Sequence, residues 1–308
     1  MIDPYLQQIV DGMAASGFQL PNPFEATAMR AVMDNPMPMP PIEVGERRDI
    51  RISVPHGEVA ARLYHPAPGT DLPVILFFHG GGWVVGTLDT HDRMAAALAN
   101  GTGLPVLSVD YRLAPEHPFP AGLDDCVAVA QALPEIAGEH GLRPTGYAVA
   151  GDSAGGNLAA AVALRLAGTE HAPVHQLLYY PVIDADFGRL SYANAPEGGF
   201  LSLDMMRWFW DQYVSDSDER RHPHVSPIHA ESHEGLAPAT LVLAGYDPLH
   251  DEGLAYGEAM KRAGVEVDIH DFPGGIHGFA SMFGMAPIGD EALQVGIDAL
   301  KKALAPHR

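Results

Sequence analysis

Residues 147–156 read Tyr-Ala-Val-Ala-Gly-Asp-Ser-Ala-Gly-Gly, an apolar run that leads into a serine flanked by glycines. Segment 147–150 predicts a buried strand and segment 154–167 a helix, so Ser153 stands on the turn between them. Gly151 and Gly155 remove the Cβ atoms that would crowd so sharp a turn. Ser153 then lies at a helix N-terminus, where free N–H groups favour a developing anion. A glycine-rich phosphate loop is the alternative, but no lysine follows the serine and the glycine spacing differs.

On both sides of this unit, short apolar runs alternate with helical segments, which is typical of a parallel sheet covered by helices. The expected strands are 74–78, 106–109, 147–150, 176–180, 240–244 and 265–272, preceded by an antiparallel hairpin of 49–54 and 59–64. The expected helices of this region are 91–99, 121–133, 154–167, 252–263 and 290–303. We therefore expect an α/β fold with a mostly parallel, doubly wound sheet of about eight strands.

Two regions lie outside this alternation. Asp3-Pro4 predicts the start of a first helix, and Asn22-Pro23 predicts the start of a second, which the proline-rich run 35–41 must end. The interval 184–236 is too long for a simple connection between strands, and we interpret it as an insertion. We expect a helical cap made of 1–45 and 184–225 over a core made of 46–183 and 226–308.

The insertion carries methionine and aromatic residues at helical spacing. They are Met205, Met206, Trp208, Phe209, Trp210 and Tyr213. Core packing and a lid over an apolar pocket are both open interpretations of this cluster.

The composition excludes several classes of protein. The chain has 308 residues, 47% of them hydrophobic and 19% charged, which argues against disorder, collagen and coiled coil. Its 18 Lys+Arg and 39 Asp+Glu give a net charge of -21, so nucleic acid and anionic membranes are poor partners. The single cysteine, Cys126, cannot form an intrachain disulfide. Because the start lacks basic residues and no apolar run approaches the roughly 20 residues of a membrane span, we expect no membrane insertion and a cytoplasmic location.

A second glycine-rich stretch, His79-Gly80-Gly81-Gly82-Trp83, follows the strand expected at 74–78. Three glycines let the backbone turn and direct N–H groups inward with no side chain in the way. Acyl transfer requires such donors for the oxyanion of its tetrahedral intermediate. A tight turn without function is the alternative, and the presence of Ser153 argues against it.

At these residues the chain resembles the hormone-sensitive-lipase-like (family IV) microbial carboxylesterases of the α/β-hydrolase fold. His-Gly-Gly-Gly and Gly-Asp-Ser-Ala-Gly-Gly mark that family. Residues 110–121, Asp-Tyr-Arg-Leu-Ala-Pro-Glu-His-Pro-Phe-Pro-Ala, are similar to a further stretch typical of it. The resemblance covers nearly the whole chain and implies esters of short to medium acyl chain length as substrates.

The positions of strand ends select the catalytic acid and base. In this fold the order is serine, acid, histidine, with acid and base after successive late strands. Asp247 follows the strand expected at 240–244 and His277 the strand expected at 265–272, and both match the family's Asp-Pro-Leu and His-Gly-Phe motifs. The rival acid, Asp251, is interpreted as the N-cap of the next helix. The rival base, His270, lies inside a strand.

We therefore expect a serine carboxylesterase in which Ser153 attacks, His277 moves the proton and Asp247 orients the imidazole. The oxyanion donors are expected at Gly81, Gly82 and Ala154. Such a mechanism needs neither a metal nor an organic cofactor. The histidines at 222, 224, 229 and 233 lack the spacing of a metal motif and are interpreted as a solvated loop.

Four aromatic residues are expected to line the substrate pocket: Trp83, Trp208, Phe209 and Phe279. Core packing is the alternative for each. The expected partner is a small-molecule ester, and a homodimer is left open. Amide hydrolysis by the same triad is one alternative function, and a non-catalytic small-molecule receptor is another. The receptors of this fold have lost the catalytic histidine, so the presence of His277 argues against the receptor.

Overall fold

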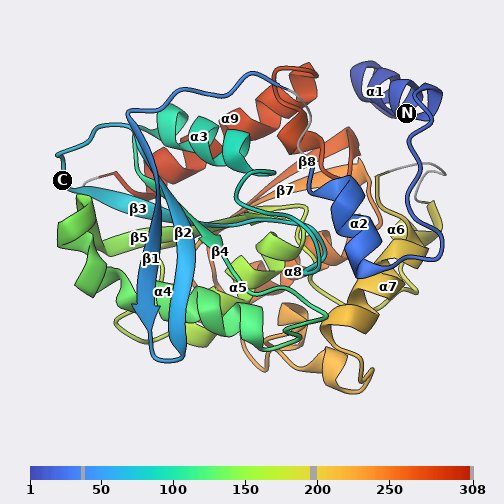
Figure 1. Ribbon diagram of the computed structural model, residues 1–308. Coiled ribbons are helices and arrows are strands. Elements are labelled where there is room, and N and C mark those ends of the chain that lie inside the picture. The colour runs from blue at the N-terminus through green and yellow to red at the C-terminus, as the bar shows by residue number, and fades with distance from the viewer. Residues whose placement is uncertain (36–38, 195–199, 306–308) are drawn as a thin grey trace.

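The computed structural model describes residues 1–35, 39–194 and 200–305 (Figure 1). Within these residues the strands form one eight-stranded sheet in the spatial order β1-β2-β4-β3-β5-β6-β7-β8. The strands are β1 (Glu46–Val54), β2 (Gly57–His65), β3 (Leu72–Phe78), β4 (Val106–Asp110), β5 (Leu142–Asp152), β6 (His175–Tyr179), β7 (Ala239–Tyr246) and β8 (Val267–Ile276). The helices are α1 (Pro4–Ala15), α2 (Ala26–Met33), α3 (Asp92–Thr102), α4 (Ala121–His140), α5 (Ala154–Leu166), α6 (Leu190–Asn194), α7 (Leu203–Tyr213), α8 (His250–Arg262) and α9 (Pro287–Ala303), with short 3-10 turns at Glu219–Arg221, Pro227–His229 and Phe279–Met282.

Strand pairing follows the hydrophobic pattern of the sequence. β1 pairs with β2 and β2 with β4 in antiparallel fashion, whereas the strands from β4 to β8 are parallel. The inner strands β3, β4, β6 and β7 are almost wholly buried, and the edge strands β1 and β8 alternate between buried and exposed positions. This difference is expected, because a strand covered on both faces needs apolar residues at successive positions. The doubly wound arrangement predicted from the sequence is confirmed.

Successive residues of the inner strands point into two separate cores. Ile75 and Phe77 of β3 pack in the core that α3 and α9 cover. Leu76 and Phe78 pack in the other core, with α4, α5 and α8. In Figure 1 the sheet runs between these two helical layers. The carboxyl ends of the parallel strands therefore meet at one edge of a sheet that is held from both sides.

The structure places the end of the helix predicted at 121–133 further along the chain. α4 continues past Leu133 to His140, with Pro134 inside it, and ends at Gly141 with φ 64°. The proline removes one helical donor, but the buried residues Leu133 and Ala137 on either side pack α4 against the core.

Asn22 does not cap the second helix, because α2 begins at Ala26 with Glu25 before it. Leu20 and Phe24 pack against the core instead, which keeps this segment out of the helix. Of the run predicted to end this helix, Pro36, Met37 and Pro38 lie outside the described residues, and α2 ends before them at Met33.

In Figure 1, helices α2, α6 and α7 are drawn at the same end of the sheet. α6 and α7 belong to the long connection between β6 and β7. Ser202 caps α7 by accepting the Met205 N–H at 3.2 Å, and Asp3 caps α1 in the same way with the Tyr5 N–H at 2.9 Å. Among the described residues, no helix is long and apolar enough to cross a bilayer.

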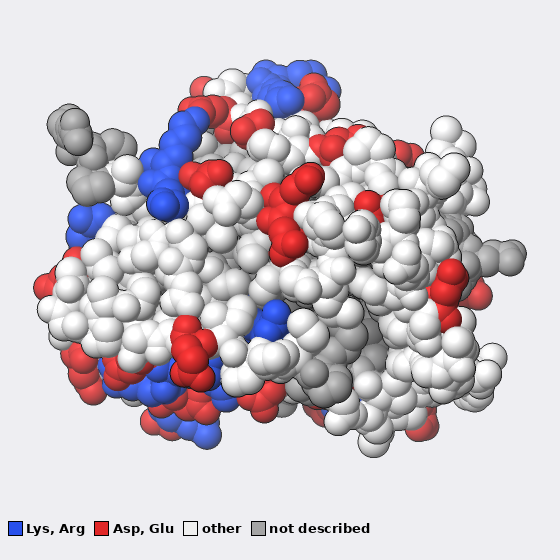
Figure 2. All heavy atoms as spheres, turned by 90° about the horizontal axis from the view of Figure 1, so that it is seen from above, with Lys and Arg blue, Asp and Glu red and all other residues white. Residues whose placement is uncertain are grey.

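Acidic and basic groups are mixed on the surface. On the face drawn in Figure 2, basic groups lie next to acidic ones, and much of the area carries neither. Arg62, for example, binds Asp49 at 2.6 Å and Asp89 at 2.7 Å.

Candidate active site

Ser153 lies on the turn that joins β5 to α5. Its backbone has φ 55° and ψ -119°, a conformation that residues with a Cβ rarely adopt. A Cβ on Gly151 would collide with the Gly155 carbonyl, and a Cβ on Gly155 would collide with the Phe78 carbonyl of β3. The turn is possible only because both positions are glycine. The Ser153 N–H donates to the Tyr179 carbonyl at 2.9 Å, so the neighbouring strand holds this strained residue.

His277 connects Ser153 to Asp247. Its Nδ1 lies 2.7 Å from Asp247 Oδ2, and its Nε2 lies 2.9 Å from Ser153 Oγ. The Asp247 side chain is fully buried and its Oδ1 accepts the Leu249 N–H at 2.9 Å. Because the carboxylate accepts the proton on Nδ1, the lone pair of Nε2 is left to accept the serine hydroxyl. The structure thus brings together the three residues that strand ends had selected.

The two rival residues face other partners. Asp251 is not the N-cap of α8, because Leu249 occupies that position. The Asp251 carboxylate instead accepts the N–H of Ser191 at 2.9 Å, from α6. His270 Nε2 lies 3.1 Å from Asp268 Oδ2 on the same strand, β8.

The glycines after β3 lie beside Ser153. Gly81 and Gly82 have φ 115° and 56°, and both line the same cavity as Ser153 and His277. Ala154 is the buried first residue of α5. In the described part of the chain, the hydrogen bonds of the structure include none donated by the N–H groups of Gly81, Gly82 or Ala154. These three N–H groups therefore have no hydrogen-bond acceptor among the described residues.

Two residues that the sequence analysis did not single out support the glycine loop. Asp152 Oδ1 accepts the Gly80 N–H at 2.9 Å, and its Oδ2 lies 3.4 Å from His91 Nε2. Burial alone would raise the pKa of the Asp152 carboxyl, but the His91 and His79 rings and the Gly80 N–H hold it below its usual value. Asp152 belongs to the serine motif and could have been suspected from it. His91 carried no signal in the sequence.

His79 is buried at the start of the same loop. Burial lowers the pKa of His79 to about 4, so the ring is neutral near pH 7. Its Nδ1–H donates to the Gly80 carbonyl at 2.7 Å, and its ring stacks on Tyr111 at 4.5 Å. The Tyr111 hydroxyl donates to the His79 carbonyl at 2.7 Å.

The cavity next to Ser153 has a volume of about 270 Å³ and a largely apolar wall. Four methionines contribute to this wall, together with Phe209: Met33, Met205, Met206 and Met282. Helices α2 and α7 contribute much of the apolar lining, whereas Asp152, Ser153 and His277 come from the carboxyl ends of β5 and β8.

Three of the four expected pocket residues do not line this cavity. Trp83 is 1% exposed and stacks on Tyr213 at 4.2 Å, because its side chain turns away from the loop toward α7. Trp208 packs against Phe24 at 5.9 Å, on the side of α7 that faces the N-terminal segment. Phe279 is fully buried and packs between Tyr180 and Phe272.

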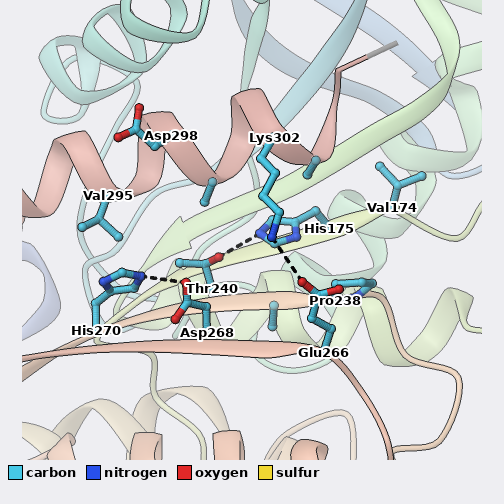
Figure 3. Close-up of a pocket in the computed structure, with 13 residues that line it drawn as sticks. Val174, His175, Pro238, Thr240, Glu266, Asp268, His270, Val295, Asp298 and Lys302 are labelled. Carbon is cyan, nitrogen blue, oxygen red and sulfur yellow. Dashed lines mark hydrogen bonds and ion pairs between the residues drawn. The ribbon is translucent and has the colours of Figure 1, made fainter. Parts of the chain in front are cut away.

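A larger cavity, of about 460 Å³, lies at the opposite end of the sheet (Figure 3). It is formed where β6, β7 and β8 begin, with α9 over it. Two pairs of polar side chains meet there: Lys302 lies 3.3 Å from Glu266, and His270 lies 3.1 Å from Asp268. The residues that line it include no serine or cysteine. Ser153 and His277 line the other cavity, next to the glycine loop.

The histidines between the insertion and β7 have separate partners. His229 Nε2 lies 2.9 Å from Asp184 Oδ1, and His233 Nε2 donates to the Pro227 carbonyl at 3.1 Å. Among the residues that the structure describes, no three His, Cys, Asp or Glu side chains converge as metal ligands would.

Comparison with known proteins identifies the family. Residues 75–281 match the family described as alpha/beta hydrolase fold. The chain belongs to this family. It is 41% identical over 287 residues to the carboxylic ester hydrolase LipN of Mycobacterium tuberculosis, covering 91% of this chain and 74% of that protein. An ethyl acetate hydrolase of Pseudomonas putida is 38% identical over 248 residues, covering 79% and 78% of the two chains.

Among solved structures, an ester hydrolase from the metagenome of Lake Arreo, complexed with a derivative of bipyridine phosphonate, superimposes with a TM-score of 0.90. It is 35% identical and the match covers 98% of this chain and 99% of that one. The expected resemblance to the hormone-sensitive-lipase-like carboxylesterases is confirmed, and with it the expectation that this α/β-hydrolase is a carboxylic ester hydrolase.

Proposed function

We propose that this α/β-hydrolase cleaves carboxylic esters through a Ser153-His277-Asp247 triad and an acyl-enzyme. The observation that carries the proposal is the pair of contacts made by His277, 2.9 Å to Ser153 Oγ and 2.7 Å to Asp247 Oδ2. As Ser153 Oγ bonds to the ester carbonyl carbon, its proton passes to His277 Nε2. Asp247 stabilises the imidazolium and keeps its ring oriented.

The oxyanion of the tetrahedral intermediate accepts hydrogen bonds from the N–H groups of Gly81, Gly82 and Ala154. When the intermediate collapses, the bond to the alcohol oxygen breaks and His277 gives its proton to the leaving alcohol. Water then attacks the carbonyl carbon of the acyl-enzyme while His277 takes one of its protons. As the bond to Ser153 Oγ breaks, His277 returns this proton to Oγ, and the carboxylic acid leaves. Each step uses groups that line one cavity or lie directly behind it.

The acyl chain that fits is neutral and short to medium in length. Four methionines and Phe209 give much of the wall an apolar surface, and flexible methionine side chains adapt to acyl chains of different length. The relative named an ethyl acetate hydrolase supports the short end of this range. We propose that α2, α6 and α7 act as the cap that closes the cavity and excludes water.

A series of p-nitrophenyl esters from acetate to laurate, beside the p-nitroanilide of the preferred acid, tests the proposal. We expect kcat/KM to be greatest for a short or medium chain, to fall for laurate, and to be far lower for the anilide. Ser153→Ala should reduce kcat on the order of 10⁶-fold with an unchanged circular dichroism spectrum. A fluorophosphonate should label Ser153. Labelling of another serine, or faster cleavage of the anilide than of the ester, would contradict the assignment.

A further inference from the structure

Arg30 of α2 makes polar contacts with the loop that follows Gly82 and with residues 114 and 116. Its Nε donates to the Val84 carbonyl at 2.8 Å, and its Nη2 donates to the Ala114 carbonyl at 2.9 Å. Glu116 holds the guanidinium from the other side, with Nη1 to Oε1 and Nη2 to Oε2 both at 2.7 Å. One side chain thus joins three segments that are distant in the sequence.

Val84 belongs to the loop that carries the proposed oxyanion donors. The N–H groups of Val84 and Val85 donate to the Gly81 carbonyl at 3.0 and 2.9 Å. The Gly81 carbonyl belongs to the same peptide as the Gly82 N–H, one of the proposed oxyanion donors. This peptide is therefore bound to the segment that Arg30 holds through Val84. Asp34, the residue that follows α2, accepts the Gly86 N–H at 2.7 Å and binds the end of the same loop.

The loop needs such partners because its own conformation is unfavourable. Gly81, Gly82 and Gly86 have positive φ, and so does Trp83, at 61°. A tryptophan in this region is strained, and strain of this kind persists only where the surroundings hold it. The Trp83 carbonyl accepts the Ala114 N–H at 2.9 Å, so the segment that Arg30 binds through the Ala114 carbonyl also holds Trp83.

We propose that Arg30 is a positioning residue for ester cleavage, which holds the loop 81–86 so that the Gly81 and Gly82 N–H groups meet the oxyanion. The inference rests on the proposed function. It gives a role to residues 110–121, in which Ala114 and Glu116 form the other half of the clamp.

Glu116 orients Arg30 rather than anchoring the fold. Its side chain is 54% exposed, and an exposed ion pair contributes little stability. The hydrogen bond from Arg30 lowers the pKa of Glu116 to about 2, so the carboxylate is ionised throughout the pH range of an esterase assay. The bond to the Val84 carbonyl reaches the loop directly, and the bond to the Ala114 carbonyl reaches it through the Ala114–Trp83 hydrogen bond.

Three variants separate positioning from folding. Arg30→Met removes every donor but keeps an apolar stem, Arg30→Lys keeps the charge and can reach one carbonyl, and Glu116→Gln leaves both backbone bonds of Arg30 in place. For Arg30→Met we expect kcat to fall about 10- to 100-fold with KM changed only a few-fold, because the oxyanion exists only after the attack. Arg30→Lys should recover part of this loss, and Glu116→Gln should lose least.

A tetrahedral inhibitor distinguishes positioning from a general loss of structure. A trifluoromethyl ketone that adds to Ser153 forms an oxyanion, so its affinity should weaken in Arg30→Met in proportion to kcat/KM. Thermal melting and circular dichroism of each variant report folding separately. If Arg30→Met does not fold, Arg30→Lys decides by the same two readouts.

Three results for Arg30→Met would overturn the inference. They are a wild-type kcat, an increase in KM with no change in kcat, and a loss of inhibitor affinity that does not follow kcat/KM. A lower melting temperature with unchanged turnover of the folded protein would also overturn it. These outcomes differ from failure of the proposed function, in which the wild-type chain itself would not cleave the esters.

Discussion

Asp247 and Asp251 lie close together in the sequence after β7, but their carboxylates have different surroundings. The Asp247 side chain is fully buried, and both of its oxygens accept N–H groups, from His277 and Leu249. The Asp251 side chain is 36% exposed and accepts the Ser191 N–H and a contact from the neighbouring His250. At the scale of single residues, the choice of acid follows from which carboxylate reaches the imidazole.

Exchange of each carboxylate for an amide tests this choice. Asp247→Asn keeps the shape of the side chain but favours the wrong imidazole tautomer, and we expect kcat to fall about 10⁴-fold, as in a related triad. Asp251→Asn retains an oxygen that can accept the Ser191 N–H, so most activity should remain. Turnover of a p-nitrophenyl ester, with folding checked by circular dichroism, compares the two. An active Asp247→Asn beside an inactive Asp251→Asn would refute the triad.

At the scale of elements, α7 presents different residues to three surroundings. Met205, Met206 and Phe209 line the cavity. Trp208, the residue before Phe209, packs against Phe24, and Trp210 packs against Trp83 at 4.9 Å. A Cβ on Gly82 would collide with the Phe209 ring, so the helix also touches the glycine loop. Helical periodicity assigns these neighbours to separate faces.

The neighbours Trp208 and Phe209 form a matched pair for a test of chain-length preference. Phe209→Ala enlarges the cavity, and we expect the optimum of kcat/KM in the ester series to shift toward longer acyl chains. Trp208→Ala should leave the profile unchanged and lower the free energy of unfolding by about 1 to 3 kcal/mol, since it loses packing outside the cavity. The same shift in Trp208→Ala would show that the far side of α7 also sets the preference.

At the scale of the whole molecule, buried neutral histidines connect stability to pH. Burial lowers the pKa of both His79 and His175 to about 4. In the unfolded chain a histidine binds its proton near pH 6.5, so acid favours the unfolded state. The contribution of these neutral histidines to the free energy of unfolding is present in full above pH 6.5. It is lost as the pH falls from 6.5 to about 4, and below pH 4 the histidines cause no further change in stability. The loss is on the order of 3 kcal/mol per histidine.

His175 allows this effect to be measured apart from catalysis, because it lies in the cavity at the far end of the sheet (Figure 3). We expect His175→Gln to flatten the decline of unfolding free energy between pH 6.5 and 4.5 by up to about 1.4 kcal/mol per pH unit, the value for one proton. Urea unfolding at several pH values gives the slope. His117→Gln, on an exposed ring, controls for the substitution itself. An equal slope in His175→Gln and the wild-type chain would exclude this histidine as a source of acid sensitivity.

Local chemistry explains why the sequence predicted so much of the fold and the candidate site. The turn at Ser153 depends on glycines two residues away on either side, and the buried strands are continuous apolar runs, so both are readable from a short window. The chain order serine, acid, histidine follows from where parallel strands end, which places Asp247 and His277 without knowledge of side-chain contacts. These features depend on neighbours in the sequence or on the regular geometry of the sheet.

The tertiary structure alone decided which side chains face the cavity and what holds the glycine loop. Trp83 and Trp208 are large aromatic residues of the kind that line apolar pockets, but neither faces the cavity. Trp83 stacks on Tyr213 of α7, and Trp208 packs against Phe24 of the N-terminal segment. Arg30 meets Val84 and Glu116 across separations of 54 and 86 residues. Such contacts depend on the relative placement of whole elements, which is a property of the packed core and leaves no periodic pattern in the chain.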